Sequence, residues 1–309
     1  MEQGASLESL FQAYFDCRKS KRNTMNALRF EMDYEGNLIA LREELNSSTW
    51  HPGRSIAFVI DKPVKREIFA ADFRDRVVHH WFINQLNPLF EKAFIFDSYA
   101  SRKGRGAHMG IARAAQFIRK CSLNYQRDCH VLKLDIMSFL IRINRRILWE
   151  RLCCFIERHY NQPDKKLILE VAGKIVENEP INNCFIKGRR HDWQDFPKDK
   201  SLFYARPHCG LPIGNLTSQV FANFYLNSFD HYIKHDLGVR FYGRYVDDFI
   251  LVHEDKAFLK SLIPQMEQFL QEELELELHP RKQYLQHYRK GIPFLGVILK
   301  PHCIYAGRR

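Results

Sequence analysis

The clearest pattern of hydrophobic and polar positions begins at residue 131. Residues 131–134 form a short apolar run, which predicts a buried strand that ends at Asp135. A helix is expected near residues 145–159. Farther on, aromatic and aliphatic residues recur at helical spacing from Ser218 to about His235, which predicts an amphipathic helix with its aromatic face in the core.

Two strand-like runs follow, at residues 239–246 and 249–252. Asp247 and Asp248 lie between them at a tight turn, so the pattern predicts a hairpin with two acids at its tip. From Asp255, a residue suited to an N-cap, apolar positions repeat at a helical period as far as Leu270. Residues 274–278 then alternate between leucine and glutamate, which predicts a strand.

The order strand, helix, hairpin, helix, strand predicts the β-α-β-β-α-β arrangement of a ferredoxin-like antiparallel sheet in a mixed α+β fold. In that arrangement the first strand lies beside the hairpin, so Asp135 and Asp247 should meet. Residues 178–214 are rich in loop signals such as Gly188-Arg189-Arg190. We expect them to form an insertion over a rigid scaffold.

The composition indicates a large folded unit with a basic surface. The chain has 309 residues and is 45% hydrophobic, which is enough for a substantial core and excludes a disordered tail protein. Its 47 Lys and Arg residues against 36 Asp and Glu residues give a formal charge of +11. Such a balance attracts polyanions, with nucleic acid as the leading partner, although charge alone does not exclude a basic protein without one.

The N-terminal region and the cysteines indicate the compartment. Residues 1–30 contain no continuous apolar stretch, so we expect neither a signal peptide nor a membrane span, and a cytoplasmic protein with no membrane partner. The eight cysteines form no C-x-x-C pair and no zinc-type spacing with histidine. They are expected to be reduced thiols.

Asp135, Asp247 and Asp248 supply the candidate chemistry. Three carboxylates that converge on one point repel each other unless a cation lies among them. Two divalent ions about 3.5–4 Å apart on such carboxylates stabilise the attacking and leaving oxygens of a phosphoryl displacement, which is polymerase chemistry. An Asp-Asp pair is more often an ordinary solvated turn, so the neighbouring motifs decide between the two interpretations.

These motifs resemble those of reverse transcriptases, in order from about residue 55 to 298. Tyr245-Val246-Asp247-Asp248 looks like the family's catalytic hairpin, and Leu134-Asp135-Ile136 with Phe139 looks like its first catalytic motif. The resemblance implies an RNA-directed DNA polymerase, a nucleotidyltransferase. It also implies two Mg²⁺ ions, with Mn²⁺ as a possible substitute, on the three aspartates and the backbone carbonyl of Ile136.

Basic residues upstream extend the resemblance to the fingers motif. Lys62-Pro63, Arg66-Glu67-Ile68 and residues 73–78 look like that motif, and residues 98–102 look like the segment after it. In the family these residues cover the nucleotide triphosphate, and fixed cations can hold a polyphosphate. A solvated charged face is the alternative. The resemblance assigns to the nucleotide Lys62, Arg66, Arg74, Arg102, Phe139 and Leu140, and to template or primer Arg76, Lys103 and Arg105.

Residues 210–219 are the most discriminating stretch. Most reverse transcriptases carry Gln-Gly and end in Ser-Pro at the places where this chain has Ile213-Gly214 and Ser218-Gln219. The variant resembles reverse transcriptases of bacterial and phage diversity-generating retroelements, which misincorporate opposite template adenines, and parts of the insertion such as Asp192-Trp193 also look like that group. Ile213 is then assigned to the template, and Gly214 and Gln219 to the nucleotide. A plain turn that opens a helix is the alternative.

Two motifs near the C-terminus complete the set. His279-Pro280-Arg281-Lys282 resembles the loop that places a basic residue, here Lys282, near the triphosphate. Residues 291–296 resemble the primer grip, which assigns Phe294, Leu295 and Gly296 to template or primer together with Tyr245. Taken singly, Lys282 is more often a solvated lysine and Phe294 a core residue.

The resemblance implies the fingers and palm of a right-hand polymerase. We expect an N-terminal helical extension over residues 1–50 and fingers over 51–128. A palm is expected over 129–290, with an insertion at 161–209, and the primer grip with the start of a truncated thumb over 291–309. A missing or truncated thumb predicts low processivity.

Leu140 departs from the family, in which the matching residue is usually a large aromatic that excludes the ribonucleotide 2′-hydroxyl. Weaker discrimination against ribonucleotides is therefore expected. The expected partners are template and primer RNA, dNTPs and the small basic accessory protein of the retroelement, in a bacterial cell. A retron or phage-defence reverse transcriptase and a catalytically impaired RNA-binding relative remain alternatives.

Overall fold

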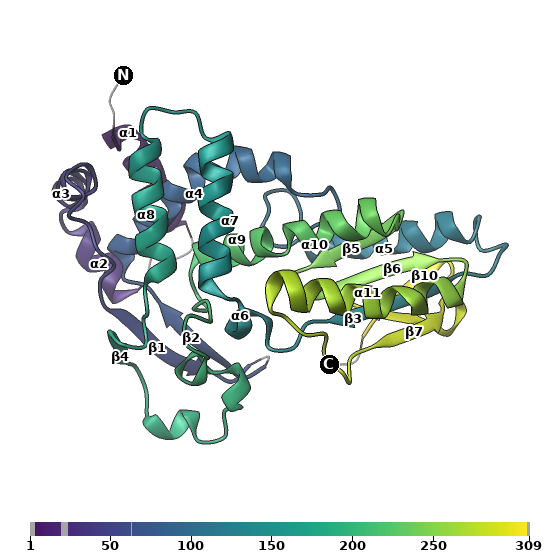
Figure 1. Cartoon of the computed structure of the whole chain (residues 1–309). Coiled ribbons are helices and arrows are strands. Elements are labelled where there is room, and N and C mark those ends of the chain that lie inside the picture. Colours follow the sequence, from purple (N-terminus) through teal and green to yellow (C-terminus); the bar gives the residue numbers. More distant parts are fainter. Residues whose placement is uncertain (1–3, 20–23, 63, 308–309) are drawn as a thin grey trace. The chain divides into compact units, whose positions relative to one another are not determined.

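The computed structural model describes residues 4–19, 24–62 and 64–307 (Figure 1). It contains two compact units: unit 1 is Met1–Glu91 with Leu140–Phe221, and unit 2 is Lys92–Phe139 with Ala222–Arg309. The predicted division into extension, fingers, palm and primer grip is a functional one and stays a prediction. Pro63, part of the predicted fingers motif, lies outside the described residues.

Unit 2 contains a four-stranded antiparallel sheet. Its strands are β3 (His130–Asp135), β5 (Phe241–Tyr245), β6 (Asp248–His253) and β7 (Tyr284–His287), in the order β5-β6-β3-β7. In chain order these are strands two, three, one and four, which is the ferredoxin-like arrangement. The predicted α+β fold class is confirmed.

Helices cover both faces of this sheet in Figure 1. Ala114, Phe117 and Ile118 of α5 (Ala107–Cys121) share one buried cluster with strand residues that include Val131 and Ile250. Side chains alternate along a strand, so Asp135 and Asp248 point to this same face. The cluster thus supports the strand ends that carry the acids.

The helix α11 (Lys256–Leu274) confirms the predicted apolar period and N-cap. The Asp255 side chain accepts a hydrogen bond from the Ala257 backbone N–H, and five apolar residues along the helix are buried. The predicted strand at residues 274–278 is wrong. Leu274 still belongs to the helix, which Glu275 ends in the left-handed conformation with φ 51°, and the fourth strand is β7.

The predicted helix from Ser218 to about His235 is divided into three parts. It consists of α9 (Leu216–Tyr225), α10 (Asn227–His231) and a π-helical turn at Tyr232–Asp236. The aromatic periodicity is real, because Phe229 contacts both Phe249 of β6 and Phe269 of α11. Periodicity alone does not reveal such breaks, since each part presents the same face to the core.

Unit 1 combines helices with a small sheet. Its N-terminal helices are α1 (Leu7–Arg18), α2 (Met25–Glu31) and α3 (Tyr34–Asn46). The sheet has the order β2-β1-β4, formed by β1 (Ser55–Ile60), β2 (Arg66–Ala70) and β4 (Cys184–Ile186). Helix α4 (Phe73–Ala93) follows β2, and the short α6 (Phe139–Arg142) begins in unit 2 and ends in unit 1.

The predicted helix at residues 145–159 is confirmed as α7 (Arg145–His159), which packs against α8 (Lys165–Glu177). After α8 the chain consists mainly of loops and three short 3-10 helices, Arg190–Trp193, Lys198–Lys200 and Leu202–Tyr204. The predicted loop-like insertion over residues 178–214 is therefore largely confirmed. The parallel strand β4 within it was not predicted.

Glu67 of β2 holds this insertion. Its buried carboxylate accepts hydrogen bonds from Trp193 Nε1 at 2.7 Å, from Ser201 Oγ at 2.7 Å and from the Leu202 backbone N–H at 2.6 Å. A carboxylate with three donors is well compensated for its burial. The insertion is thus fixed to the β1–β2 hairpin.

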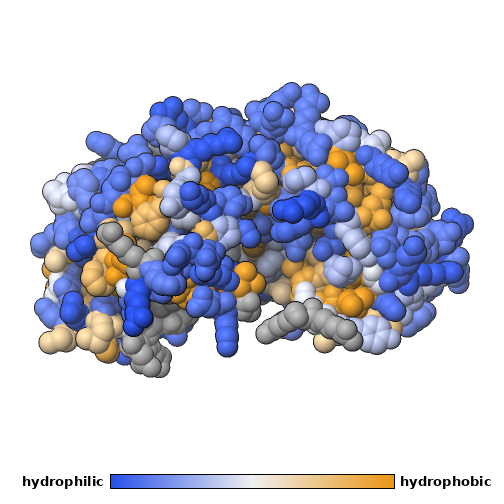
Figure 2. All heavy atoms as spheres, turned by 90° about the horizontal axis from the view of Figure 1, so that it is seen from below, coloured by the Kyte–Doolittle hydropathy of each residue, from blue (hydrophilic) through white to orange (hydrophobic). Residues whose placement is uncertain are grey.

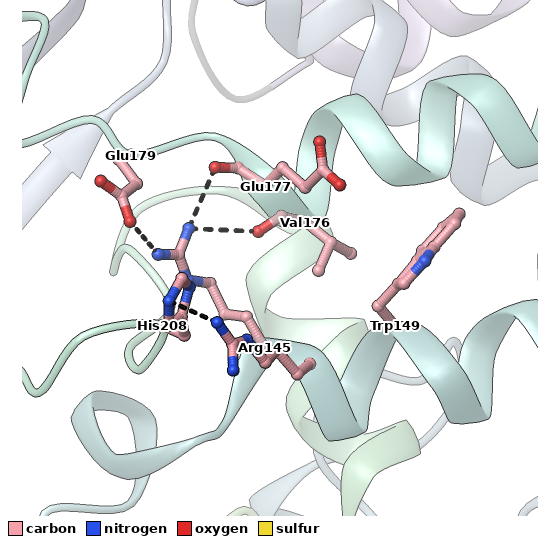
Figure 3. Close-up of a pocket in the computed structure, with 7 residues that line it drawn as sticks. Arg145, Trp149, Val176, Glu177, Glu179 and His208 are labelled. Atoms are coloured by element: carbon pink, nitrogen blue, oxygen red, sulfur yellow. Dashed lines mark hydrogen bonds and ion pairs between the residues drawn. The ribbon is translucent and has the colours of Figure 1, made fainter.

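A pocket of about 350 Å³ lies where the insertion leaves α8 and returns to α7 (Figure 3). Arg145 donates to the backbone carbonyls of Val176 and Glu177 at the end of α8 and forms an ion pair with Glu179. The Arg146 guanidinium lies 2.8 Å from His208 Nε2. Because Arg145 satisfies the last carbonyls of α8, we interpret this pocket as a structural junction.

The last strands of unit 2 form a separate antiparallel sheet, β8 (Ile292–Phe294), β9 (Val297–Lys300) and β10 (Cys303–Ala306). All eight cysteines are free thiols. None of the helices in the described ranges combines the length and apolar character that a bilayer crossing needs. On the face shown in Figure 2, hydrophilic residues cover most of the surface and leave smaller hydrophobic areas between them.

Candidate active site

The three predicted catalytic acids lie at adjoining strand ends in unit 2. The register of β3 and β6 places Asp135 directly opposite Asp248, and Asp247 immediately precedes β6 in the hairpin turn. Asp247 is close enough to both other carboxylates for each to raise its pKa. The sheet therefore brings together the acids that the sequence pattern predicted to meet.

Backbone strain marks the hairpin turn. Val246 adopts a positive φ of 56°, which is unfavourable for a β-branched residue. Strain of this kind persists where the surrounding structure fixes it, and it concentrates at functional sites. Here one side chain supplies the constraint, because Arg244 Nη1 donates a 2.9 Å hydrogen bond to the Val246 carbonyl.

Arg244 is fully buried and is held by a polar network. Its Nε and Nη2 donate to the Asp230 carboxylate at 2.7 and 2.6 Å, and Asp230 also accepts from the Tyr242 hydroxyl at 2.6 Å. Nη1 lies 3.2 Å from Asn223 Oδ1. Burial by itself lowers the pKa of Arg244, but Asp230 outweighs this effect and the pKa is raised. The guanidinium therefore stays charged beneath the turn.

The pKa values of Asp247 and Asp248 show that two nearby lysines only partly offset the negative charge of the acids. Burial raises the pKa of Asp247 to about 6, with further increases from Asp135 and Asp248. Burial also raises the pKa of Asp248, which Lys133 opposes from 3.8 Å. Such shifts mean that the cluster would be stabilised by an added cation.

Lys282 already supplies one positive charge. Its Nζ lies 3.0 and 2.9 Å from the two carboxylate oxygens of Asp135. The loop reaches this position because the His279 backbone N–H donates to the Asp135 carbonyl at 2.7 Å, and the Met137 N–H donates to the Glu277 carbonyl at 2.9 Å. The lysine expected near the triphosphate thus contacts Asp135, one of the three predicted catalytic acids.

The donor chemistry of the site fits a divalent cation. Carboxylate oxygens are the ligands that Mg²⁺ and Mn²⁺ prefer, and the three acids repel one another without a cation. Across the described residues no group of three or more His, Cys, Asp or Glu side chains is arranged as a ready metal site. The Lys282 ammonium contacts both oxygens of the Asp135 carboxylate, so a divalent cation on Asp135 would have to displace it.

The other predicted residues of unit 2 differ in burial and in their partners. Ile136 and Phe139 are buried, and Tyr245 is partly exposed at the end of β5. The buried Arg102 guanidinium donates to the carbonyls of Ile95 and Ser98, at 2.7 and 2.8 Å. Arg105 stacks on Phe96, whereas Lys103 is exposed. Of these three cations, the exposed Lys103 is the most accessible to an outside ligand.

The predicted primer grip forms the turn between β8 and β9. Phe294 is buried, and the Lys133 ammonium lies 5.7 Å from the centre of its ring. Leu295 and Gly296 both have positive φ, at 48° and 83°. Phe294 is a core residue, as expected of a phenylalanine taken singly. Its ring also lies near Lys133, the lysine that pairs with Asp248.

The four cations of the predicted fingers motif, all in unit 1, differ in how far their side chains are exposed to solvent. Lys62 and Arg66 are exposed on the β1–β2 hairpin. Arg74 forms ion pairs with Glu44 and Asp75. Arg76 is largely buried, and burial lowers its pKa. Lys62 and Arg66 are thus the cations of this motif that present charge to solvent.

The discriminating stretch packs against β2. The Phe69 backbone N–H donates to the Ile213 carbonyl at 2.8 Å, and a Cβ on Gly214, whose φ is 121°, would lie 2.9 Å from Ile68 Cγ2. The close approach that requires glycine is therefore to β2. Gln219 is exposed on α9, and Leu140 is partly exposed in α6.

Sequence analysis missed the buried pair of Arg244 and Asp230 and the contact of Lys133 with Asp248. A signal was present for Arg244: it stands near the apolar end of the predicted strand at residues 239–246, between Tyr242 and Tyr245, and a buried cation there must find a partner. Asp230 gave the complementary signal, because it is an acid within the predicted aromatic helix and needs a partner if it is buried.

Three comparisons place this geometry among known proteins. A model of the family described as "Reverse transcriptase (RNA-dependent DNA polymerase)" matches residues 61–299. "Protein YkfC" of Escherichia coli (strain K12) is 23% identical over 290 residues, which cover 83% of this chain and 69% of that protein.

Solved structures of telomerase share the fold. Telomerase from Candida albicans, in complex with a TWJ fragment of telomeric RNA, matches with a TM-score of 0.57 and 12% identity over 85% of this chain and 48% of that chain. Apo telomerase from Candida tropicalis, truncated from its C-terminal domain, matches with a TM-score of 0.57 and 12% identity over 88% and 60%. The chain thus spans about half the length of these telomerase chains.

Proposed function

This chain belongs to the reverse transcriptase (RNA-dependent DNA polymerase) family, and from that premise we propose that it copies RNA into DNA at Asp135, Asp247 and Asp248. The observation that carries the proposal is the register of β3 and β6, which sets Asp135 opposite Asp248 with Asp247 beside them in the strained turn. A structural turn has no need to gather three repelling carboxylates.

The residues divide the chemistry among them. The three aspartates would hold two divalent ions, which we propose to be Mg²⁺, with the Ile136 carbonyl as a further ligand. When bound, these ions supply charge stabilisation for the attacking 3′-hydroxyl and the leaving pyrophosphate. Lys282 leaves Asp135 and neutralises charge on the triphosphate, and its ammonium can donate a proton to the leaving pyrophosphate.

The nucleotide and the nucleic acid require further cations. Lys62 and Arg66 are exposed, and we assign them to the triphosphate, together with Gly214 and Gln219 of the discriminating stretch. Lys103 and the primer-grip turn at Leu295 and Gly296 are assigned to template and primer. Arg74 and Arg102, which bond within the protein, act by fixing the segments that carry these groups.

A diversity-generating retroelement is the source that we propose for the chain. Ile213-Gly214 and Ser218-Gln219 support this origin, as do the insertion residues Trp193 and Ser201, which meet on Glu67. The corresponding partners are a template-repeat RNA, dNTPs and a small basic accessory protein, in a bacterial cytoplasm. A retron or phage-defence reverse transcriptase is the competing origin, with the same acids and a different template.

Primer extension on an adenine-containing RNA template tests both levels of the proposal. Wild type with Mg²⁺ should extend the primer, and Asp247→Ala should not, whereas Asp236→Ala, at an exposed acid of the same unit, should be fully active. Sequenced products should carry substitutions opposite template adenines. Extension without adenine-directed errors would reject the retroelement origin and leave the polymerase assignment intact, and no extension by wild type would favour an impaired RNA-binding relative.

Gln219→Pro provides a second test of the retroelement origin. Gln219 offers a side-chain amide at a position where most of the family carries proline. The substitution should change misincorporation at template adenines more than it changes the dependence of the rate on Mg²⁺. Unchanged misincorporation would show that Gln219 does not influence fidelity.

A further inference from the structure

A groove of about 970 Å³ lies within unit 2, between α5 and the β9–β10 hairpin. Its floor and walls come from three segments that are distant in sequence: α5, the turn after it, and the last two strands. The cations and amides that line it are Arg113, Gln116, Arg119, Asn124, Gln126, Lys300 and the ring of His302. The groove is separate from the residues assigned above to nucleotide and metal.

The charge of the groove has one sign. Three of its lining residues are lysine or arginine, and no carboxylate is among the described residues that line it. Arg113 is neutralised by Asp97, at 2.6 and 2.9 Å, whereas Arg119 bonds the neutral Asn124 Oδ1 at 2.6 Å. Arg119 and Lys300 are exposed. The two exposed cations therefore face solvent with no acid opposing them in the groove.

The turn after α5 is strained and firmly held. Leu123, Asn124 and Tyr125 have successive φ values of 47°, 60° and 68°, although non-glycine residues normally enter this region singly. The Tyr125 N–H donates to Ser122 Oγ at 2.9 Å, and the Tyr288 hydroxyl donates to the Tyr125 carbonyl at 3.1 Å. Backbone strain that the surrounding structure maintains in this way clusters at active sites and ligand clamps, which makes this turn a candidate for binding.

The turn places an aromatic pair beside the cations. The rings of Tyr125 and His302 meet edge to face with their centres 4.5 Å apart, and His302 itself has a positive φ of 63°. Aromatic faces next to a cationic track are the combination that binds single-stranded nucleic acid, since bases stack on the rings and phosphates pair with the cations. Amide groups such as Asn124 add hydrogen bonds to sugars and phosphates.

We propose that this groove binds a single RNA strand, with phosphates on Arg119 and Lys300 and a base against the Tyr125–His302 pair. The inference rests on the proposed function, because a polymerase that copies RNA must hold more of the strand than the base being copied. The alternation of strand side chains directs Asp135 toward the same sheet face as α5, so RNA bound at the groove and RNA at the acids share that face.

The test is RNA affinity measured by fluorescence anisotropy with a labelled single-stranded RNA of about 30 nucleotides, over a series of salt concentrations. The groove variant is Arg119→Gln with Lys300→Gln. The matched control is Lys256→Gln with Lys260→Gln, two exposed lysines of α11 in the same unit. The groove variant should bind about tenfold more weakly, and the slope of log affinity against log salt concentration should fall in magnitude by about 1.4, or roughly 0.7 for each lost phosphate contact of a single strand. The control should bind within about twofold of wild type.

Tyr125→Leu supplies a second measurement that does not change charge. It should weaken RNA binding about threefold to tenfold with an unaltered salt slope, because stacking is lost and phosphate contacts remain. Equal affinity of the groove variant and the control would overturn the proposal, as would displacement of the RNA by polyglutamate, which indicates an acidic protein partner. Asp247→Ala should bind RNA as wild type does, so a failure of the groove and a failure of the polymerase assignment are distinguishable.

Discussion

At the scale of single residues, the candidate site sets three carboxylates against two lysines. Lys133 opposes Asp248 from 3.8 Å, and Lys282 contacts both oxygens of Asp135. No ion pair of Asp247 is found among the described residues, and although the Lys282 charge lowers its pKa, burial and the other two acids raise it to about 6. A cation that enters the site must therefore compete with Lys282 for Asp135.

Lys282→Met should strengthen binding of divalent metal. The Lys282 side chain is 56% exposed, so its pair with Asp135 contributes only about 0.2–1 kcal/mol, and its removal should raise Mn²⁺ affinity about twofold to fivefold. Electron paramagnetic resonance of bound Mn²⁺ measures this without reference to activity. Lys290→Met, at an exposed lysine of the same unit, should leave the affinity unchanged. Weaker Mn²⁺ binding by Lys282→Met would show that the ammonium does not compete for the site.

Leu140→Tyr should increase discrimination against ribonucleotides. Leu140 follows the buried Phe139 and is partly exposed, and a leucine leaves room where most of the family has an aromatic ring. The added ring should lower the efficiency of rNTP incorporation by at least about tenfold, the range that one well-placed steric contact supplies. Steady-state incorporation of a matched dNTP and rNTP measures the ratio. Strong exclusion by wild type itself would contradict the role given to Leu140.

At the scale of elements, the β5–β6 hairpin depends on what lies beneath it. The sequence predicted this hairpin correctly, since two apolar runs flank a pair of aspartates. It could not predict that Val246 would have a positive φ, or that Arg244 would hold its carbonyl. Those features depend on Asp230 and Asn223, which reach Arg244 only in the folded unit.

Arg244→Lys should lower kcat while leaving RNA affinity nearly unchanged. A lysine keeps the charge beside Asp230 but cannot also bond the Val246 carbonyl, so the turn that carries Asp247 loses its support. Arg244→Met leaves Asp230 buried without its partner and should lower the free energy of unfolding by about 3–5 kcal/mol. Arg240→Met, at an exposed position just before β5, is the control. If the Arg244→Lys enzyme kept the wild-type kcat, Arg244 would not be needed to position the turn that carries Asp247.

Glu67→Ala should release the insertion from β2. The substitution removes the acceptor of three donors, two of them buried and the third the partly buried Trp193 indole, at a cost of about 2–4 kcal/mol. Limited proteolysis should then cut within residues 187–200 faster than in wild type. Asp61→Asn, at an exposed acid of the same hairpin, should not change the cutting rate. Equal protection of the Glu67 variant would mean that other contacts hold the insertion.

The segment after α11 shows where sequence patterns reach their limit. The alternation of leucine and glutamate at residues 274–278 matches a strand, yet Leu274 completes the helix and Leu278 makes only an isolated bridge to Ile136. The segment buries Leu274, Leu276 and Leu278, as a strand would, although it is not one, so the local alternation of apolar residues cannot distinguish the two. The conformation of this segment depends on its contacts with the end of β3. Those contacts lead the chain to Lys282.

At the scale of the whole molecule, element order was the most informative property of the sequence. It predicted that β3 lies beside the β5–β6 hairpin and that Asp135 meets the hairpin acids, because the ferredoxin-like connection permits few alternatives, but it placed the fourth strand at residues 274–278 instead of at β7. It did not predict that residues of the fingers motif and of the insertion would share unit 1, joined through Glu67. Contacts between segments more than one hundred residues apart leave no local pattern.

Single-turnover addition of one dNTP to a primer on an RNA template tests the central claim most directly. Wild type should add the nucleotide only when Mg²⁺ or Mn²⁺ is present. Asp135→Ala, Asp247→Ala and Asp248→Ala should each reduce the rate at least about a thousandfold, while their affinity for the RNA stays within about twofold of wild type. Addition by any of the three variants at the wild-type rate would contradict the account.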